Sequence, residues 1–115
     1  MTQTKYKFTR AEVRLPAIEQ QIAGSIQSIF CDSPISFKLW DITSIGIGIL
    51  AAEELTAGEH VVILFEGYPG EVMKCQVAWS QPYKLGADLH RAGLKVVDHE
   101  IGILADLIDK IENDC

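Results

Sequence analysis

The pattern of hydrophobic and polar positions predicts short β-strands over most of the chain. Stretches that are β-branched, or that place apolar residues on one face of a pleat, are bounded by Gly, Pro, Asp or Ser. The predicted strands are Ser25–Cys31, Phe37–Trp40, Gly46–Leu50, His60–Phe65, Val72–Trp79 and Tyr83–Leu89. Several short strands at this spacing favour a closed or nearly closed antiparallel barrel, because closure removes the exposed edges that invite aggregation.

Turn residues separate the predicted strands. The turns are expected at Asp32–Pro34, Glu66–Gly70 and Ser80–Pro82, the last joining the final two strands as a hairpin. The segment Pro16–Gly24 is ambiguous, because Ile18 and Ile22 lie four residues apart as in a helix while their neighbours are polar. It is interpreted as a connection or as the beginning of the first strand.

The pattern changes to a helical period near the C-terminus and predicts an amphipathic helix over residues 98–113. Asp98 is a candidate N-cap, and Glu100 favours the first turn electrostatically. The apolar positions are Ile101, Leu104, Leu107, Ile108 and Ile111. This stripe needs cover, either from the barrel of the same chain or from the same helix of a second subunit, which would make a homodimer.

The length of 115 residues, with 48% hydrophobic and 23% charged residues, predicts one folded domain over residues 1–115. Lysines near the N-terminus have no apolar stretch behind them, so no secretory signal is expected. The longest apolar run, Ile45–Ala52, is far shorter than the roughly 20 residues that span a bilayer. We therefore expect a soluble, cytoplasmic protein that does not insert into a membrane.

The charge distribution divides the chain into a basic N-terminal arm and an acidic body. The net charge is −6, which disfavours a nucleic-acid polymer as a partner. Within residues 1–14, Lys5, Lys7, Arg10 and Arg14 face Glu12 alone, a net charge of +3 that leaves −9 on the remaining residues. We expect residues 1–15 to form a flexible basic arm and residues 16–97 to form the barrel. Such an arm suits a small anionic ligand.

Two motifs could carry binding chemistry. Arg10 and Arg14 form an RxxxR pattern, and a guanidinium can bind a phosphate or the O6/N7 edge of guanine with two parallel hydrogen bonds. Alone, the pattern is also typical of an ordinary solvated surface. The second motif is Asp41-Ile-Thr-Ser-Ile-Gly46, in which Asp41 can accept hydrogen bonds from guanine and Thr43 can add a hydroxyl contact. Alone, it is also typical of a turn whose side chains bond their own backbone.

In this order, the two motifs resemble the PilZ family, in which an RxxxR arm precedes a six-stranded antiparallel barrel and a D/NxSxxG motif lies between strands. The resemblance extends to the strand ending at Trp79, the segment YKLGADL and the C-terminal helix. It implies that Arg10 and Arg14 contact the phosphates and guanine of cyclic di-GMP, the ligand of that family. It also implies that Asp41 and Thr43 contact guanine and that Gly46 shapes the loop, with Ser44 able to supply the hydroxyl if the register slips.

The sequence departs from that family at two positions of the second motif. Thr43 replaces the usual serine, which keeps the hydroxyl and adds a methyl group, and Ile45 stands where many members have glycine. The leading hypothesis is a cyclic di-GMP sensor that signals to a downstream protein partner when its arm becomes ordered. The alternative is a PilZ-like adaptor that acts through protein contacts, within a motility or secretion apparatus, without the ligand.

No motif predicts catalysis, a metal or a cofactor. The histidines His60, His90 and His99 are dispersed, and the cysteines Cys31, Cys75 and Cys115 have neither zinc-site nor disulfide-framework spacing. Glu53 and Glu54 are adjacent, so their side chains diverge and do not make an acid/base pair. Trp40 and Trp79 are interpreted as packing residues of the core or the barrel rim.

Overall fold

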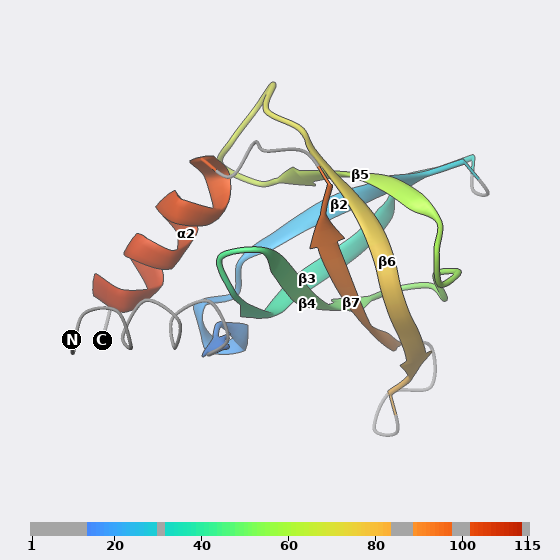
Figure 1. The fold of residues 1–115 in the computed structure, drawn as a ribbon, viewed down its shortest axis with the longest axis horizontal. Helices are drawn as coiled ribbons and strands as arrows, with labels where there is room; N and C mark the ends of the chain where they lie inside the picture. The colour runs from blue at the N-terminus through green and yellow to red at the C-terminus, as the bar shows by residue number, and fades with distance from the viewer. Residues whose placement is uncertain (1–13, 30–31, 84–88, 98–101, 114–115) are drawn as a thin grey trace.

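The computed structural model describes residues 14–29, 32–83, 89–97 and 102–113. These parts of the chain contain seven strands, one short 3-10 helix and one α-helix (Figure 1). The elements are β1 (Leu15–Pro16), η1 (Ile18–Gln20), β2 (Ala23–Ser28), β3 (Ile35–Ile42), β4 (Gly46–Ala51), β5 (His60–Phe65), β6 (Met73–Pro82), β7 (His90–Val96) and α2 (Gly102–Asn113).

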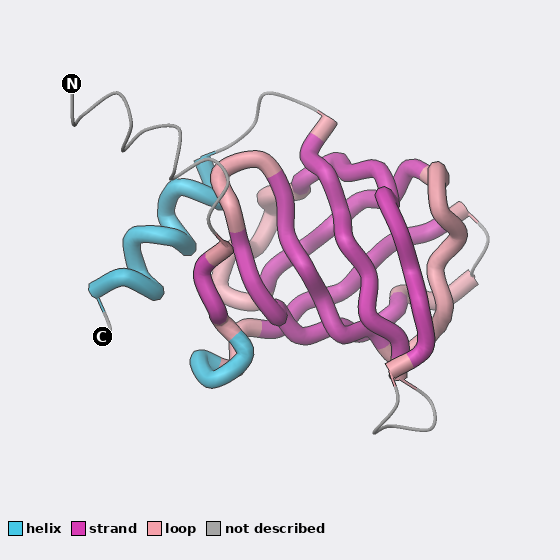
Figure 2. The backbone as a smooth tube through the Cα atoms, turned by 60° about the horizontal axis from the view of Figure 1, so that its bottom comes forward, coloured by secondary structure: helices cyan, strands magenta, loops and turns pink. Residues whose placement is uncertain are grey.

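Antiparallel pairing closes six of the described strands into a barrel (Figure 2). The order is β3-β2-β5-β6-β7-β4, and β4 returns to pair with β3. The short strand β1 is an addition to the barrel, since it pairs with the end of β3 beyond the part that β2 occupies. The predicted six-stranded antiparallel barrel is confirmed.

The barrel interior is filled by the alternate residues of each strand. In β3, for example, Ile35, Phe37 and Leu39 are buried while Ser36 and Lys38 are exposed. This period of two is typical of a strand with one buried face. The Phe37 and Phe65 rings meet edge to face at 5.5 Å and join β3 to β5 across the core.

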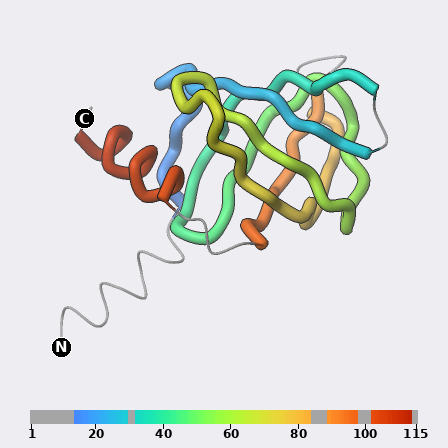
Figure 3. The backbone as a smooth tube through the Cα atoms, turned by 90° about the horizontal axis from the view of Figure 1, so that it is seen from above, coloured from blue at the N-terminus to red at the C-terminus, as the bar shows by residue number. Residues whose placement is uncertain are grey.

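Helix α2 lies against one end of the barrel (Figure 3). Its buried residues, Ile103, Leu104, Leu107 and Ile111, belong to the same hydrophobic cluster as the barrel interior. The apolar stripe is therefore covered by the chain's own barrel. The predicted N-cap, Asp98, lies outside the described residues, and the described helix begins at Gly102.

The loop between β5 and β6 holds α2 from the side. The Tyr68 hydroxyl donates a hydrogen bond to Asp106 Oδ2, and Lys110 Nζ lies 5.0 Å from the centre of the Tyr68 ring. This loop is the predicted turn Glu66–Gly70, and it contains Gly67 and Gly70 with positive φ values, which glycine adopts without steric cost.

The prediction of the last hairpin is wrong. Ser80, Gln81 and Pro82 continue β6, and the last described strand is β7. Most of the predicted strand Tyr83–Leu89, residues 84–88, lies outside the described residues. A bulge between Val77 and Trp79 interrupts the alternation of β6, so the pattern resembles a strand that stops at Trp79. Pro82 is the last residue of β6, a position where proline is tolerated because the ladder ends there.

Two further boundaries differ from the sequence-based expectations. Leu15, assigned to the arm, pairs with Ile42 in β1. The ambiguous segment Pro16–Gly24 contains both elements that its pattern suggested: the 3-10 turn of η1, closed by Gln21 at φ 58°, and the start of β2 at Ala23.

Candidate functional site

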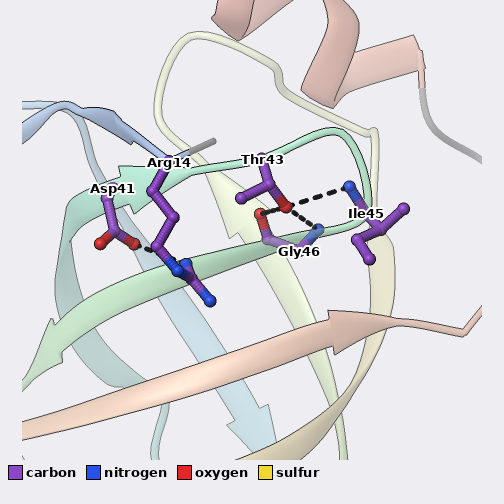
Figure 4. A network of polar contacts seen from close by, with 5 residues as sticks. All are labelled: Arg14, Asp41, Thr43, Ile45 and Gly46. Atoms are coloured by element: carbon purple, nitrogen blue, oxygen red, sulfur yellow. Dashed lines mark hydrogen bonds and ion pairs between the residues drawn. The ribbon is translucent and has the colours of Figure 1, made fainter. Parts of the chain in front are cut away.

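Strand β1 brings Arg14 to Asp41. Leu15 and Pro16 lie opposite Ile42 and Asp41, and Ala17 N donates to Trp40 O at 2.9 Å, which fixes the path of the chain after Arg14. Arg14 Nη1 then lies 2.9 Å from Asp41 Oδ1 as a hydrogen-bonded ion pair (Figure 4). The Arg14 side chain is 50% exposed and that of Asp41 is 15% exposed. Arg14 is the arginine of the RxxxR motif that lies within the described residues, and it is thus paired with Asp41, the first residue of the second motif.

A bulge in β3 and a glycine in β4 determine where the Asp41 carboxylate lies. The register of β3 against β4 shifts between Leu39 and Asp41, so Trp40 and Asp41 are both partly exposed, between buried Leu39 and Ile42. Asp41 pairs with Gly48, and a Cβ built on Gly48 would lie 2.2 Å from Asp41 Oδ1. The carboxylate therefore lies flat on the backbone of β4, in space that any residue other than glycine would fill.

Thr43 closes the turn between β3 and β4. Its Oγ1 accepts hydrogen bonds from Ile45 N at 3.2 Å and Gly46 N at 3.1 Å, while Thr43 N donates to Gly46 O at 2.9 Å (Figure 4). The Thr43 residue is 7% exposed. The hydroxyl oxygen of the motif thus bonds the chain's own backbone, as the turn interpretation expected. A contact of Thr43 with guanine stays a prediction.

The remaining residues of this turn differ in their exposure. Ser44 is half-buried, and the Ile45 side chain is 59% exposed. Gly46 is buried, and a Cβ there would lie 2.4 Å from Leu94 O, so close approach to β7 requires glycine. Positive φ values in the described chain occur at Gln21, Gly58, Gly67 and Gly70 and thus not in this turn. Ile45 therefore fits its position without backbone strain.

Sequence reasoning missed a group of aromatic and cationic side chains on the same outer surface. Arg91 Cζ lies 4.3 Å from the Trp40 ring centre and 5.7 Å from that of Trp79, and Trp40 meets Tyr83 edge to face at 5.5 Å. Neither tryptophan belongs to the core, and Trp79 is 36% exposed. The outward face of β7 could be recognised from sequence only with the correct β6–β7 register, which the misplaced hairpin obscured.

Three further polar groups of the described chain lie away from this surface patch and are explained by packing and hydrogen bonding. Buried Glu59 accepts from Ser28 Oγ at 2.5 Å and from Thr56 N at 2.8 Å, which ties the loop before β5 to β2. Burial raises the pKa of the Cys75 thiol to about 12, so this thiol is a poor nucleophile. Burial, followed by the hydrogen bond to Asp106, also raises the pKa of the Tyr68 hydroxyl.

Two general properties concern the described residues alone. None of their His, Cys, Asp and Glu side chains gather in a group of three or more that could hold a metal ion. Among the described helices, none has the length and apolar character needed to cross a membrane.

The structure thus brings together Arg14, Asp41, Thr43, Ser44 and Gly46 at one end of β3 and β4. Arg10, the other predicted ligand-binding arginine, lies outside the described residues. Gly48, which makes room for the Asp41 carboxylate, was not predicted as a site residue. Gly48 could have been recognised from the strand register, because it is the outward residue of β4 that lies opposite Asp41.

No protein-family model matches the chain, and no curated protein sequence matches it significantly. Among solved structures, the chain is similar to the PilZ domain of YcgR from Escherichia coli, in a structure of that domain with c-di-GMP. The superposition has a TM-score of 0.68 and covers 89% of this chain and 90% of the other, at 16% sequence identity. At 16% identity, this similarity is evidence for the fold alone. It agrees with the closed six-stranded barrel, the added strand and the C-terminal helix described above, and we conclude that this chain has the PilZ-domain fold.

Proposed function

We propose that this protein is a cytoplasmic cyclic di-GMP sensor, a binding module and not an enzyme. The observation that carries the proposal is the contact between Arg14 and Asp41, which come from separate motifs of the sequence. Arg14 supplies hydrogen-bond donors for an anion, and Asp41 supplies acceptors for the N1 and N2 donors of a guanine. A ligand with guanine and phosphate groups matches this pair, and c-di-GMP is present in the structurally similar YcgR domain.

The ion pair itself is compatible with ligand binding. A surface pair of this kind stabilises a fold by only about 0 to 1 kcal/mol, because water and salt screen it and two side chains must be ordered. Arg14 is half exposed and donates to Asp41 through Nη1. A bound phosphate can therefore take over donors of Arg14 at small cost, and Asp41 can turn its acceptors to a base.

The carboxylate is also held in place for recognition. Asp41 lies on Gly48 with low exposure, so little side-chain entropy remains to be lost when a base binds. We propose that Arg10 adds a second guanidinium and that the arm becomes ordered over the ligand, creating a surface for a downstream protein. A ligand can drive this change only by binding the ordered arm better than the free one.

The proposal is tested by calorimetric titration of the purified protein with cyclic di-GMP. The wild-type protein is expected to bind, and Arg14→Ala and Arg10→Ala are each expected to abolish detectable binding. The thermal unfolding midpoint of Arg14→Ala should stay close to that of the wild type, because the Arg14 side chain is half exposed. Lys74→Ala is the matched control, because Lys74 is an exposed cation of β6 on the side that pairs with β5.

Unchanged affinity in both arginine variants would remove the site assignment. Absence of binding by the wild-type protein would instead favour the adaptor, a second candidate supported by the 59% exposure of Ile45 beside the motif turn. Limited proteolysis separates the two readings further. Protection of the bonds after Arg10 and Arg14 by cyclic di-GMP supports the sensor, and an identical digestion pattern with and without it supports the adaptor.

A further inference from the structure

Two glycines lie side by side on the outer surface of the barrel, next to the Arg14–Asp41 pair. Gly48 of β4 and Gly93 of β7 are register partners, and both lie between residues whose side chains face the core. Because neither glycine has a side chain, side chains of the neighbouring strands can lie directly on the backbone of this glycine pair.

One polar group lies over each glycine. Asp41 Oδ1 is 2.2 Å from the place of a Gly48 Cβ, and Trp79 Nε1 is 2.3 Å from the place of a Gly93 Cβ. Asp41 and Trp79 are themselves the register partners of these glycines, from β3 and β6. A hydrogen-bond acceptor and a hydrogen-bond donor thus approach each other from opposite sides of the glycine pair.

Arg91 adds a cation to this surface. Two residues before Gly93 on β7, it faces outward, since its neighbour Ala92 is fully buried. Its guanidinium lies between the rings of Trp40 and Trp79, at 4.3 and 5.7 Å from their centres. Stacking on two indoles fixes the plane of the guanidinium and removes water from its faces.

Arg91 Nε is buried and has no hydrogen-bond partner within the described chain. No ion pair joins Arg91 to a carboxylate of the described residues. Because buried polar atoms of proteins are normally bonded, an unpartnered Nε on this surface indicates a binding group. A phosphate is the anion whose geometry best matches a planar fork of N–H donors.

We propose that Arg91 is a third ligand-binding arginine and that the ligand extends from Asp41 toward Trp79 and Arg91. The inference rests on the proposed function and extends it to β6 and β7. A base of cyclic di-GMP lies within reach of Asp41, and one phosphate accepts hydrogen bonds from Arg91. The indoles hold Arg91 in position and leave its fork directed at the phosphate.

Intrinsic fluorescence tests the location directly, because Trp40 and Trp79 are the two tryptophans of the whole chain. Addition of cyclic di-GMP is expected to change the emission, with the midpoint found by calorimetry. In Trp79→Phe and Trp40→Phe, which keep an aromatic ring, the remaining tryptophan should still respond. Calorimetric binding with unchanged emission in all three proteins would overturn the inference and leave the proposed function intact.

Substitution of Arg91 tests its role. Arg91→Met should weaken cyclic di-GMP binding about ten- to hundredfold, the usual effect of losing a charge-assisted hydrogen bond. Arg91→Lys should recover part of the affinity, because it keeps the charge and loses the fork. The difference in affinity between the wild type and Arg91→Met should be smaller at high salt, because salt screens the phosphate contact that only the wild type makes. Lys74→Met is the control and should bind as the wild type does.

The outcomes distinguish the alternatives. If Arg91 only packs the two indoles together, Arg91→Met lowers the thermal unfolding midpoint while the affinity and its salt dependence stay as in the wild type. In that case the role of Arg91 is wrong and the proposed function still stands. If the wild-type protein gives neither heat nor a fluorescence change with cyclic di-GMP, the proposed function fails and the inference fails with it.

Discussion

At the scale of single residues, Thr43 shows how one side chain can satisfy two interpretations of a motif. Its hydroxyl closes the β3–β4 turn by accepting from two backbone N–H groups, and the same atom is the expected guanine contact. A hydroxyl oxygen has two lone pairs, and both are directed at the turn. The turn role therefore accounts for the presence of a Ser or Thr here whether or not a ligand binds.

Thr43→Val tests the turn role. The substitution keeps the shape and removes the acceptor, so the buried Gly46 N–H loses its partner, and we expect a loss of about 1 to 3 kcal/mol in the free energy of unfolding. Thr43→Ser retains the acceptor and should stay close to the wild type. Urea unfolding of the three proteins gives the comparison. Equal stability of the Val and Ser variants would contradict the turn role.

Sequence patterns predicted some site residues and could not reveal others. Arg14 and Asp41 were found because a charged fork and an acid near glycine have recognisable chemistry. Gly48 and Arg91 were missed because their importance comes from partners on neighbouring strands: Gly48 lies beneath Asp41, and Arg91 lies between two indoles. Such relations depend on strand register, which single-strand patterns do not contain.

At the scale of elements, the bounds of strands without a bulge were predicted better than those of bulged strands. The predicted strand His60–Phe65 has the bounds of β5, whereas β6 extends past its bulge to Pro82. This error affected the candidate site, because the misplaced hairpin put His90 and Arg91 after the last predicted strand. Their true place in β7 is what positions Arg91 beside Gly93.

Helix α2 offers a test of how this element is held. Leu104 is 1% exposed within the barrel's core cluster, so Leu104→Ala should lower the free energy of unfolding by about 2 to 5 kcal/mol. Asp109→Ala, at an exposed position of the same helix, is the control and should have a small effect. Urea unfolding with light scattering measures stability and mass together. If Leu104→Ala left stability unchanged but altered the mass, the helix would instead be packing against a second copy.

At the scale of the whole molecule, closure of the barrel brings distant segments to one surface. Asp41, Gly48, Gly93 and Trp79 come from four strands and lie in one row across the sheet order β3-β4-β7-β6. Arg14, which precedes β1, pairs with Asp41 at one end of this row. An antiparallel barrel of short strands was predictable because apolar runs and turn residues are local signals, and the resemblance to the PilZ family supplied the number of six strands. The row was not, since it requires the register of every pair in it.

We propose above that cyclic di-GMP binds to this row of the outer surface. Two-dimensional amide NMR of the labelled protein during titration with the ligand can locate the binding surface residue by residue. We expect the largest shifts at residues 41–48 and at Arg91 and Gly93, together with the Trp79 indole N–H, while the amides of α2 stay in place. Shifts confined to α2 and the β5–β6 loop, or no shifts at saturating ligand, would contradict it.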